Sequence, residues 1–323
     1  MKTSFLKTLA CAAAALSITG AAIAQTFPSK PVTVVVPHAV GGTTDIVARL
    51  VTQQVGNALG QPVLVDNKVG GGGVIGWGTV ARAAPDGHML LTTENSLTIA
   101  PAIVAKLPFD AKKGFEHITT AASAPHVLVI NPSVPAKTVQ EFIALAKASP
   151  GKMNYGSGGN GTNTHLAGEL FKSTAGVDLM HVPYKGAGQV LQDLMGGQVQ
   201  ALITSLPTAL PHIKSGRLRP LMVTSEKRST LLPDVPSAPE SGLPKMVIDF
   251  WVGFAAPAGT PRPIIDRLNK EIVTAINSEE GKKRLAEQGL EPVGNTPAQA
   301  SAQVEAEIQR WGAVVKAAGI TAN

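Results

Sequence analysis

Two glycine-rich segments carry the residues best suited to chemistry, and that chemistry is anion binding. The first covers residues 37–45, between an apolar β-branched run and an amphipathic helical pattern. Glycines let the backbone pass close to a ligand, while Thr43 or Thr44 caps the helix and leaves further N–H groups facing outward. Such N–H groups, at the positive end of a helix dipole, form an anion site. Taken alone, the segment is also compatible with a turn that only starts a helix.

The second segment covers residues 155–165 and also stands between a strand pattern and a helix pattern. It combines four glycines with the hydroxyl groups of Tyr155, Ser157, Thr162 and Thr164. A loop of this kind offers several N–H and O–H donors to one carboxylate without a fixed cation beside it. If the two segments belong to two lobes, they face each other across a cleft.

A third glycine-rich turn supports a competing hypothesis. Gly71, Gly73 and Gly76 satisfy G-x-G-x-x-G, and Glu94 follows 23 residues after Gly71, as in a dinucleotide-binding fingerprint. Residues 66–69, however, separate the strand from the glycines, where the fingerprint has almost no gap. We prefer a structural turn, and keep an exported dinucleotide-binding oxidoreductase as the alternative function.

Motifs for catalysis and metal binding are missing from the sequence. There is no G-x-S-x-G elbow, no H-E-x-x-H and no Asp/Glu cluster with metal spacing. The seven histidines are scattered, and Ser157 has no assignable base. We therefore expect a protein that is not an enzyme and that has no catalytic residues, no metal and no cofactor.

The N-terminus has the pattern of a cleaved secretory signal peptide over residues 1–24. Lys2 and Lys7 precede an apolar stretch shorter than the roughly 20 residues of a spanning helix, and a small-x-small site ends at Ala24. The single cysteine, Cys11, lies inside this stretch without the leucine that a lipoprotein signal requires, so the mature chain has no thiol. We expect a periplasmic protein.

Charge and composition argue against nucleic-acid binding. Removal of the two lysines in residues 1–24 lowers the formal net charge from +6 to +4, and aromatic residues make up only 4% of the chain. Neither basic runs nor stacking platforms for bases are present. A faintly basic surface suits small anionic solutes.

The elements that must position these loops alternate along the chain. Short apolar β-branched runs alternate with amphipathic helical patterns, which predicts an α/β protein with largely parallel sheets. Helix ends are readable: Thr138 and Glu141 form a capping box, and Thr296-Pro297 opens a last helix that buries Trp311. Residues 231–244, with four prolines, and residues 121–126 are candidate crossings between two lobes.

At this point several motifs resemble the Bug family, the periplasmic substrate-binding proteins of tripartite tricarboxylate transporters. They occur in the family's order over nearly the whole mature chain, at residues 37–45, 84–87, 131–133, 154–171, 181–186, 232–236 and 256–261. The resemblance implies a type II periplasmic-binding-protein fold, with two Rossmann-like lobes joined by two hinge crossings. Lobe 1 is expected at residues 25–125 plus 246–323, and lobe 2 at residues 126–245.

The resemblance also implies a carboxylate held by main-chain amides and ordered waters. One wall would hold Gly41, Gly42, Thr43, Thr44 and Asp45, and the other would hold Ser157, Gly158, Thr162 and Thr164. Candidates for the distal part of the ligand are Ser96, Ser205, Phe250 and Trp251. His38 departs from the aromatic residue common in the family; it either favours a second carboxylate or packs an edge. Residues 203–205 lack the family's frequent Asp-Asn, which leaves the distal preference open.

These observations predict an extracytoplasmic receptor for a small carboxylate, either a di- or tricarboxylate or an aromatic carboxylate. Its expected partner is the membrane permease of a tripartite tricarboxylate transporter, and the receptor itself is expected to be a monomer. A sensor kinase is the alternative partner. The sequence does not separate these two partners.

Overall fold

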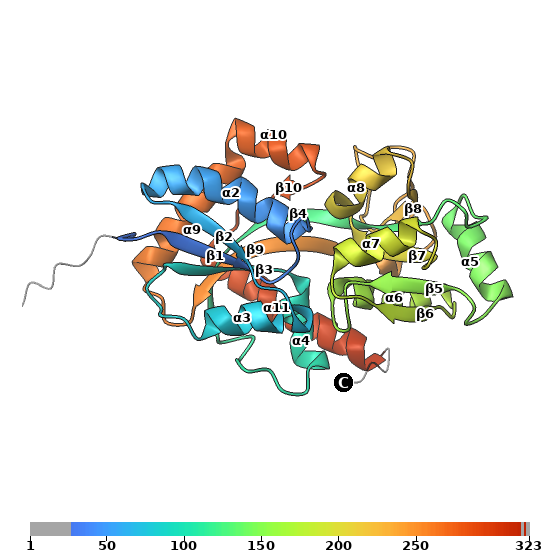
Figure 1. Ribbon diagram of the computed structural model, residues 1–323, viewed down its shortest axis with the longest axis horizontal. Coiled ribbons are helices and arrows are strands. Elements are labelled where there is room, and N and C mark those ends of the chain that lie inside the picture. The colour runs from blue at the N-terminus through green and yellow to red at the C-terminus, as the bar shows by residue number, and fades with distance from the viewer. Residues whose placement is uncertain (1–26, 318–319, 321–323) are drawn as a thin grey trace, which may run out of the picture.

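The structure, a computed structural model, describes residues 27–317 and residue 320. The predicted signal peptide lies outside the described residues. Figure 1 shows two α/β halves side by side, joined by extended strands. We call the half that contains β1, β2, β3, β9 and β10 lobe 1, and the half that contains β5 to β8 lobe 2. The residue bounds of these strands are given below. Among the described residues, no helix is both long and apolar enough to cross a membrane.

Lobe 1 is a mixed sheet with strand order β2-β1-β3-β9-β4, and β10 adds to β4. Strands β1, β2 and β3 are parallel, whereas β9 runs antiparallel between β3 and β4. The strands are β1 (Val32–Val36), β2 (Val63–Asn67), β3 (Met89–Thr93), β9 (Asp249–Pro257) and β10 (Glu291–Pro292). The helices are α2 (Thr43–Leu59), α3 (Val74–Ala81), α4 (Asn95–Ile103), α9 (Arg262–Asn277), α10 (Glu279–Glu287) and α11 (Pro297–Ala317).

Lobe 2 continues the strand order as β4-β7-β5-β6, with β8 also paired to β4. Its strands are β5 (Asn154–Ser157), β6 (Met180–Pro183), β7 (Ala201–Ser205) and β8 (Arg219–Val223). Its helices are α5 (Val139–Ala148), α6 (Asn163–Ala175), α7 (Ala187–Met195) and α8 (Leu206–Lys214). The expected alternation of strands and helices is confirmed.

Strand β4 (Phe115–Ile130) is the first crossing between the lobes. It pairs with β9 as far as Pro125 and with β7 and β8 from His126 onward. The predicted crossing at residues 121–126 is therefore part of one long strand instead of a loop between two. The strand continues through Pro125 because this residue stands where the pairing partner changes, so its missing N–H interrupts neither sheet.

The second crossing lies at Ile248, directly beside the first. Thr224 joins the two crossings: its N–H donates to the His126 carbonyl (2.9 Å), and its hydroxyl donates to the Ile248 carbonyl (2.6 Å). The proline-rich segment 231–244 packs on lobe 2 before this point; Leu232 and Leu243 lie in lobe 2 cores. The lobe boundaries at 125/126 and 245/246 stay a prediction.

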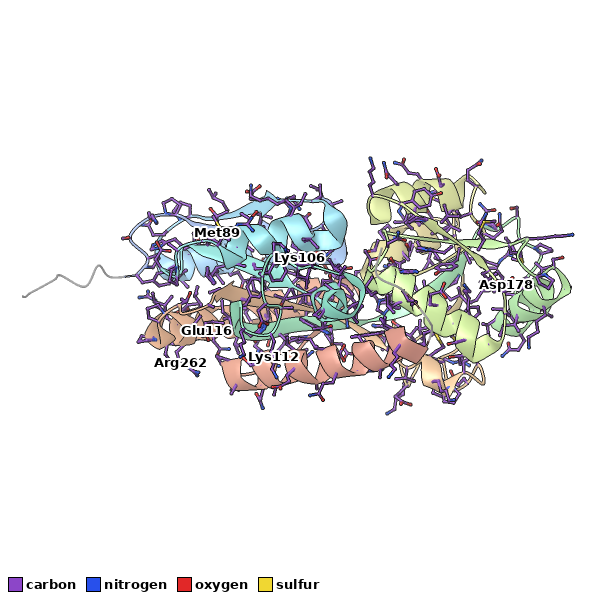
Figure 2. The ribbon with its side chains drawn as sticks, turned by 90° about the horizontal axis from the view of Figure 1, so that it is seen from below. Met89, Lys106, Lys112, Glu116, Asp178 and Arg262 are labelled. Carbon is purple, nitrogen blue, oxygen red and sulfur yellow. The ribbon has the colours of Figure 1, made fainter. Side chains whose placement is uncertain are left out.

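Helix α11 runs along the underside of the molecule and reaches from lobe 1 toward lobe 2 (Figure 2). Lys112 of lobe 1 lies beside it and pairs with Glu305. At the other end, Trp311 and Val315 pack in the same core as Phe142 of lobe 2. Trp311 is buried, as the helical spacing predicted. The predicted N-cap of α5 is also confirmed, since the Thr138 hydroxyl accepts from the Glu141 N–H. The Glu141 carboxylate accepts from the Lys137 N–H instead of the Thr138 N–H that a full capping box requires.

Candidate functional site

A cleft of about 950 Å³ lies between the lobes, and both contribute to its walls. The lobe 1 wall comes from the segments that follow β1, β2 and β3, and the lobe 2 wall from those that follow β5, β6 and β7. The carboxyl ends of parallel strands meet at one edge of each sheet, and helices begin there. The cleft is therefore surrounded by the starts of α2, α4, α6, α7 and α8.

The first glycine-rich loop places the start of α2 on the cleft. Gly41 has a φ of +81°, a conformation that favours glycine, and Gly42 is the N-cap. The N–H groups of Thr43 and Thr44 have no acceptor within residues 27–317. These two amides, at the positive end of a 17-residue helix, are available to an anion.

Asp45 anchors this loop from behind and does not line the cleft. Its buried carboxylate accepts from the Gly41 N–H (3.0 Å), the Asn67 side chain (3.0 Å) and Arg49 (2.9 Å). Burial alone would raise the pKa of Asp45, but these donors hold the pKa below its usual value. The negative charge is already paired, so Asp45 fixes the loop without taking part in its surface.

The second glycine-rich loop places the start of α6, on lobe 2, at the cleft. Thr162 is the N-cap, and the Thr164 hydroxyl accepts from the Gly158 N–H (2.9 Å) and contacts the Thr162 hydroxyl (2.9 Å). The N–H groups of Thr164 and His165 have no acceptor within the described chain. Thr164 lies on the cleft, so the start of α6 offers a second pair of amides to an anion from the opposite lobe.

Ser157 lies behind the second loop, in a stacked aromatic column. It is fully buried, and its Oγ lies 2.6 Å from His181 Nε2. The His181 ring stacks between Tyr155 (4.9 Å between centroids) and His165 (4.0 Å). Burial lowers the pKa of His181 to about 4, with a further contribution from the neighbouring His165. Burial also lowers the pKa of His165. Both histidine rings are therefore neutral near pH 7, so the column supports the loop without adding charge to the cleft.

His38 pairs with Glu94, a buried acid whose predicted role was only that of a ribose ligand in the dinucleotide hypothesis. Its Nε2 lies 2.9 Å from Glu94 Oε1, and Glu94 is 1% exposed. Burial would raise the pKa of Glu94; the hydrogen bond and charge of His38, with the Ser96 N–H (2.8 Å), hold it below its usual value. The second Glu94 oxygen also accepts from Asn163 of lobe 2 (3.0 Å).

A ring of three hydroxyl groups bridges the lobes elsewhere in the cleft. Thr43 Oγ1 of lobe 1 lies 2.6 Å from Ser205 Oγ and 3.0 Å from Thr208 Oγ1, and the last two lie 3.0 Å apart. Each hydroxyl can donate to one neighbour and accept from another. The walls are thus in direct contact, and the cleft is closed on this side.

Most of the predicted site residues come together on this cleft. The residues on its surface are His38, Gly41, Gly42, Thr43, Thr44, Ser96, Gly158, Thr162, Thr164, Ser205 and Phe250. Asp45, Ser157 and Trp251 lie behind the surface. Ligand contact by the surface residues stays a prediction. Asn163, Thr208 and Lys185 also lie on the cleft and were not predicted from the sequence; the place of Asn163 at the start of α6 is the signal that could have identified it.

The third glycine-rich turn also borders the cleft, and backbone conformation together with packing accounts for its glycines. Residues 70–73 all have positive φ. A Cβ at Gly76 would lie 2.8 Å from Pro37 Cβ, and one at Gly73 would lie 2.4 Å from the Trp77 ring. Glu94 has both oxygens occupied by protein donors, so it is not free to accept from a ribose. These features favour the structural turn over the dinucleotide hypothesis.

The fold and cleft define a protein of the periplasmic-binding type, in which two α/β lobes enclose a small-molecule site. The chain belongs to the family described as "Tripartite tricarboxylate transporter family receptor" (TctC), whose model matches residues 47–320. It is 38% identical to Protein BugT of Bordetella pertussis over 298 residues, which cover 92% of this chain and 91% of that protein.

Solved structures agree with this membership. An R. palustris protein with adipate is 35% identical with a TM-score of 0.89, covering 92% of this chain and 100% of the other. MatC from Rhodopseudomonas palustris with bound malate is 34% identical with a TM-score of 0.85, covering 90% and 100%. The periplasmic binding protein BugD is 33% identical with a TM-score of 0.87, covering 92% and 100%. The resemblance to the Bug family and the expected fold class are confirmed.

Proposed function

We propose that this protein is a monomeric periplasmic receptor, exported by its N-terminal signal, that binds a small carboxylate and delivers it to the permease of a tripartite tricarboxylate transporter. It is not an enzyme in this proposal. The observation that carries it is the pair of helix starts, α2 and α6, that present unoccupied N–H groups to one cleft from opposite lobes. Adipate and malate in two solved relatives support a carboxylate as the ligand.

The amides can supply the necessary binding energy. A hydrogen bond to a charged group contributes about 1.5–3 kcal/mol, so three or four bonds suffice for the roughly −8 kcal/mol of micromolar binding. The cleft has room for more than a four-carbon acid, which keeps di- and tricarboxylates and aromatic carboxylates as candidate ligands. A carboxylate bound between the two helix starts contacts both lobes.

A single backbone donor can be removed to test this grip. Thr44 is the second residue of α2, a position at which α8 and α9 carry a proline. Thr44→Pro deletes the N–H but is compatible with the first turn of a helix. Thr44→Ala is the matched control, because it removes the same hydroxyl and methyl groups and keeps the N–H.

Calorimetry with a panel of mono-, di-, tri- and aromatic carboxylates provides the measurement. We expect Thr44→Pro to weaken binding of the best ligand about 10- to 100-fold relative to Thr44→Ala, equivalent to one charge-assisted hydrogen bond. Equal affinity of the two variants, with equal thermal stability, would show that α2 does not hold the carboxylate. Delivery to the permease is tested by deletion of the gene for this receptor. The deletion should abolish uptake of that ligand, whereas a receptor that serves only in sensing would leave uptake intact.

A further inference from the structure

Helices α4 and α6 begin next to each other across the interlobe cleft, and a protein carboxylate lies between their starts. Asn163, the first residue of α6, donates from its backbone N–H to Ser96 Oγ (3.1 Å). It also donates from its side chain Nδ2 to Glu94 Oε2 (3.0 Å). Glu94 is the N-cap of α4. One lobe 2 residue therefore makes two hydrogen bonds to the start of a lobe 1 helix.

Glu94 occupies the same kind of environment that we propose for a ligand carboxylate. Its carboxylate accepts a hydrogen bond from the Ser96 N–H of α4 and another from the side-chain amide of Asn163, the first residue of α6. Both helix dipoles favour a negative charge at this point. His38 pairs with the other oxygen from lobe 1, so the carboxylate is held in place by its own lobe whether or not lobe 2 is docked.

The surroundings make this contact sensitive to the closure of the cleft. Gly161, two residues before Asn163, packs so closely on Ile103 of α4 that a Cβ there would lie 3.3 Å from the Ile103 side chain. With the lobes together, Glu94 is 1% exposed. Separation of the lobes would expose the carboxylate on the side that Asn163 covers and exchange the Asn163 bond for water.

We propose that Asn163 and Glu94 form a latch that favours the closed arrangement of the lobes independently of the ligand. The carboxylate at the lobe interface is that of Glu94. Asn163 is a positioning residue, because it affects ligand binding only through the closure of the two lobes. This inference rests on the proposed function only where it concerns affinity. The latch raises the affinity for every ligand by the same factor, because apparent affinity scales with the fraction of protein in the binding-competent form.

Closure can be measured by energy transfer between dyes on the two lobes. The chain has one cysteine, in the predicted signal peptide, so cysteines can replace exposed Asn57 of α2 and exposed Lys147 of α5 as labelling sites. Asn163→Ala removes only the side-chain bond to Glu94. Asn163→Asp places a like charge against Glu94, although an aspartate in the first turn favours α6 itself. Asn160→Ala, on the exposed part of the same loop, is the matched control.

For the ligand-free protein we expect Asn163→Ala to lower the closed-to-open ratio about 10-fold, and Asn163→Asp to lower it further. Asn160→Ala should leave the ratio as in the wild type. In calorimetry, Asn163→Ala should weaken every ligand of the panel by one common factor and keep their order of preference.

Two results would overturn the latch. One is an unchanged closed-to-open ratio in Asn163→Asp. The other is a loss of affinity that differs from ligand to ligand, since this would place Asn163 in contact with the ligand. If the wild type binds no carboxylate, the proposed function fails, while the energy-transfer measurement on the ligand-free protein still decides the latch.

Discussion

The Ser157→Ala substitution separates a supporting role from a ligand-contact role for the second glycine-rich loop. In the structure, Ser157 Oγ contacts His181 Nε2 (2.6 Å), accepts from the Gly159 N–H (3.1 Å) and is fully buried. The alanine leaves a ring nitrogen and an amide without these partners. A buried polar group left unpaired costs about 1–3 kcal/mol, so the free energy of unfolding should fall by about that amount.

Urea denaturation and calorimetry on the same variant make the test decisive. We expect the loss of stability together with an unchanged order of ligand preference, because no Ser157 atom reaches the cleft. Ser173→Ala, on the exposed face of α6, is the matched control and should change the free energy of unfolding by less than about 0.5 kcal/mol. A Ser157→Ala protein as stable as the wild type that binds its ligand more than 10-fold more weakly would refute this reasoning.

Two further substitutions, Gly168→Ala with Gly312→Ala as its control and His126→Leu, test the packing and the buried charge state. Gly168→Ala should lower stability by about 1–3 kcal/mol despite the better helix propensity of alanine, because the new Cβ would lie 2.2 Å from the Tyr155 ring; Gly312→Ala in α11, with open space around it, should instead raise stability slightly. Burial lowers the pKa of His126 to about 4, against about 6.5 in the unfolded chain. The unfolded state therefore binds more protons between these values, so stability falls as the pH drops; from pH 7 to 5 this histidine costs about 2 kcal/mol, and His126→Leu should lose that part of the pH dependence in denaturation curves.

The sequence predicted the loops of the site better than the individual contacts. The change from strand to helix periodicity and the glycines placed residues 37–45 and 155–165 at strand ends, and both border the cleft. Whether one residue of a loop faces the cleft or the core depends on where the strand ends and where the following helix begins. Ser157 is the final residue of β5 and points inward, whereas Thr164 is the second residue of α6 and lies on the cleft.

Contacts between residues far apart in the chain could not be predicted in this way. Glu94 and His38 are 56 residues apart, and Glu94 and Asn163 are 69 apart. Neither pair has a local pattern, and glutamate is not among the preferred N-cap residues. The continuity of strand β4 could not be predicted for a different reason. Pro125 and the small residues before it are typical of a connection between elements, and the sequence does not show that one strand can change its partners at that point.

The distribution of charge explains why affinity and lobe closure should be coupled in this protein. The start of α4 is already filled by Glu94, which is paired with His38. The starts of α2 and α6 keep unoccupied amides on opposite lobes. A carboxylate bound between the two helix starts draws on amides of both lobes, so it gains its full affinity only when the lobes are together. Contacts that bring the lobes together without the ligand, as we propose for Asn163, then act on affinity as directly as contacts to the ligand itself.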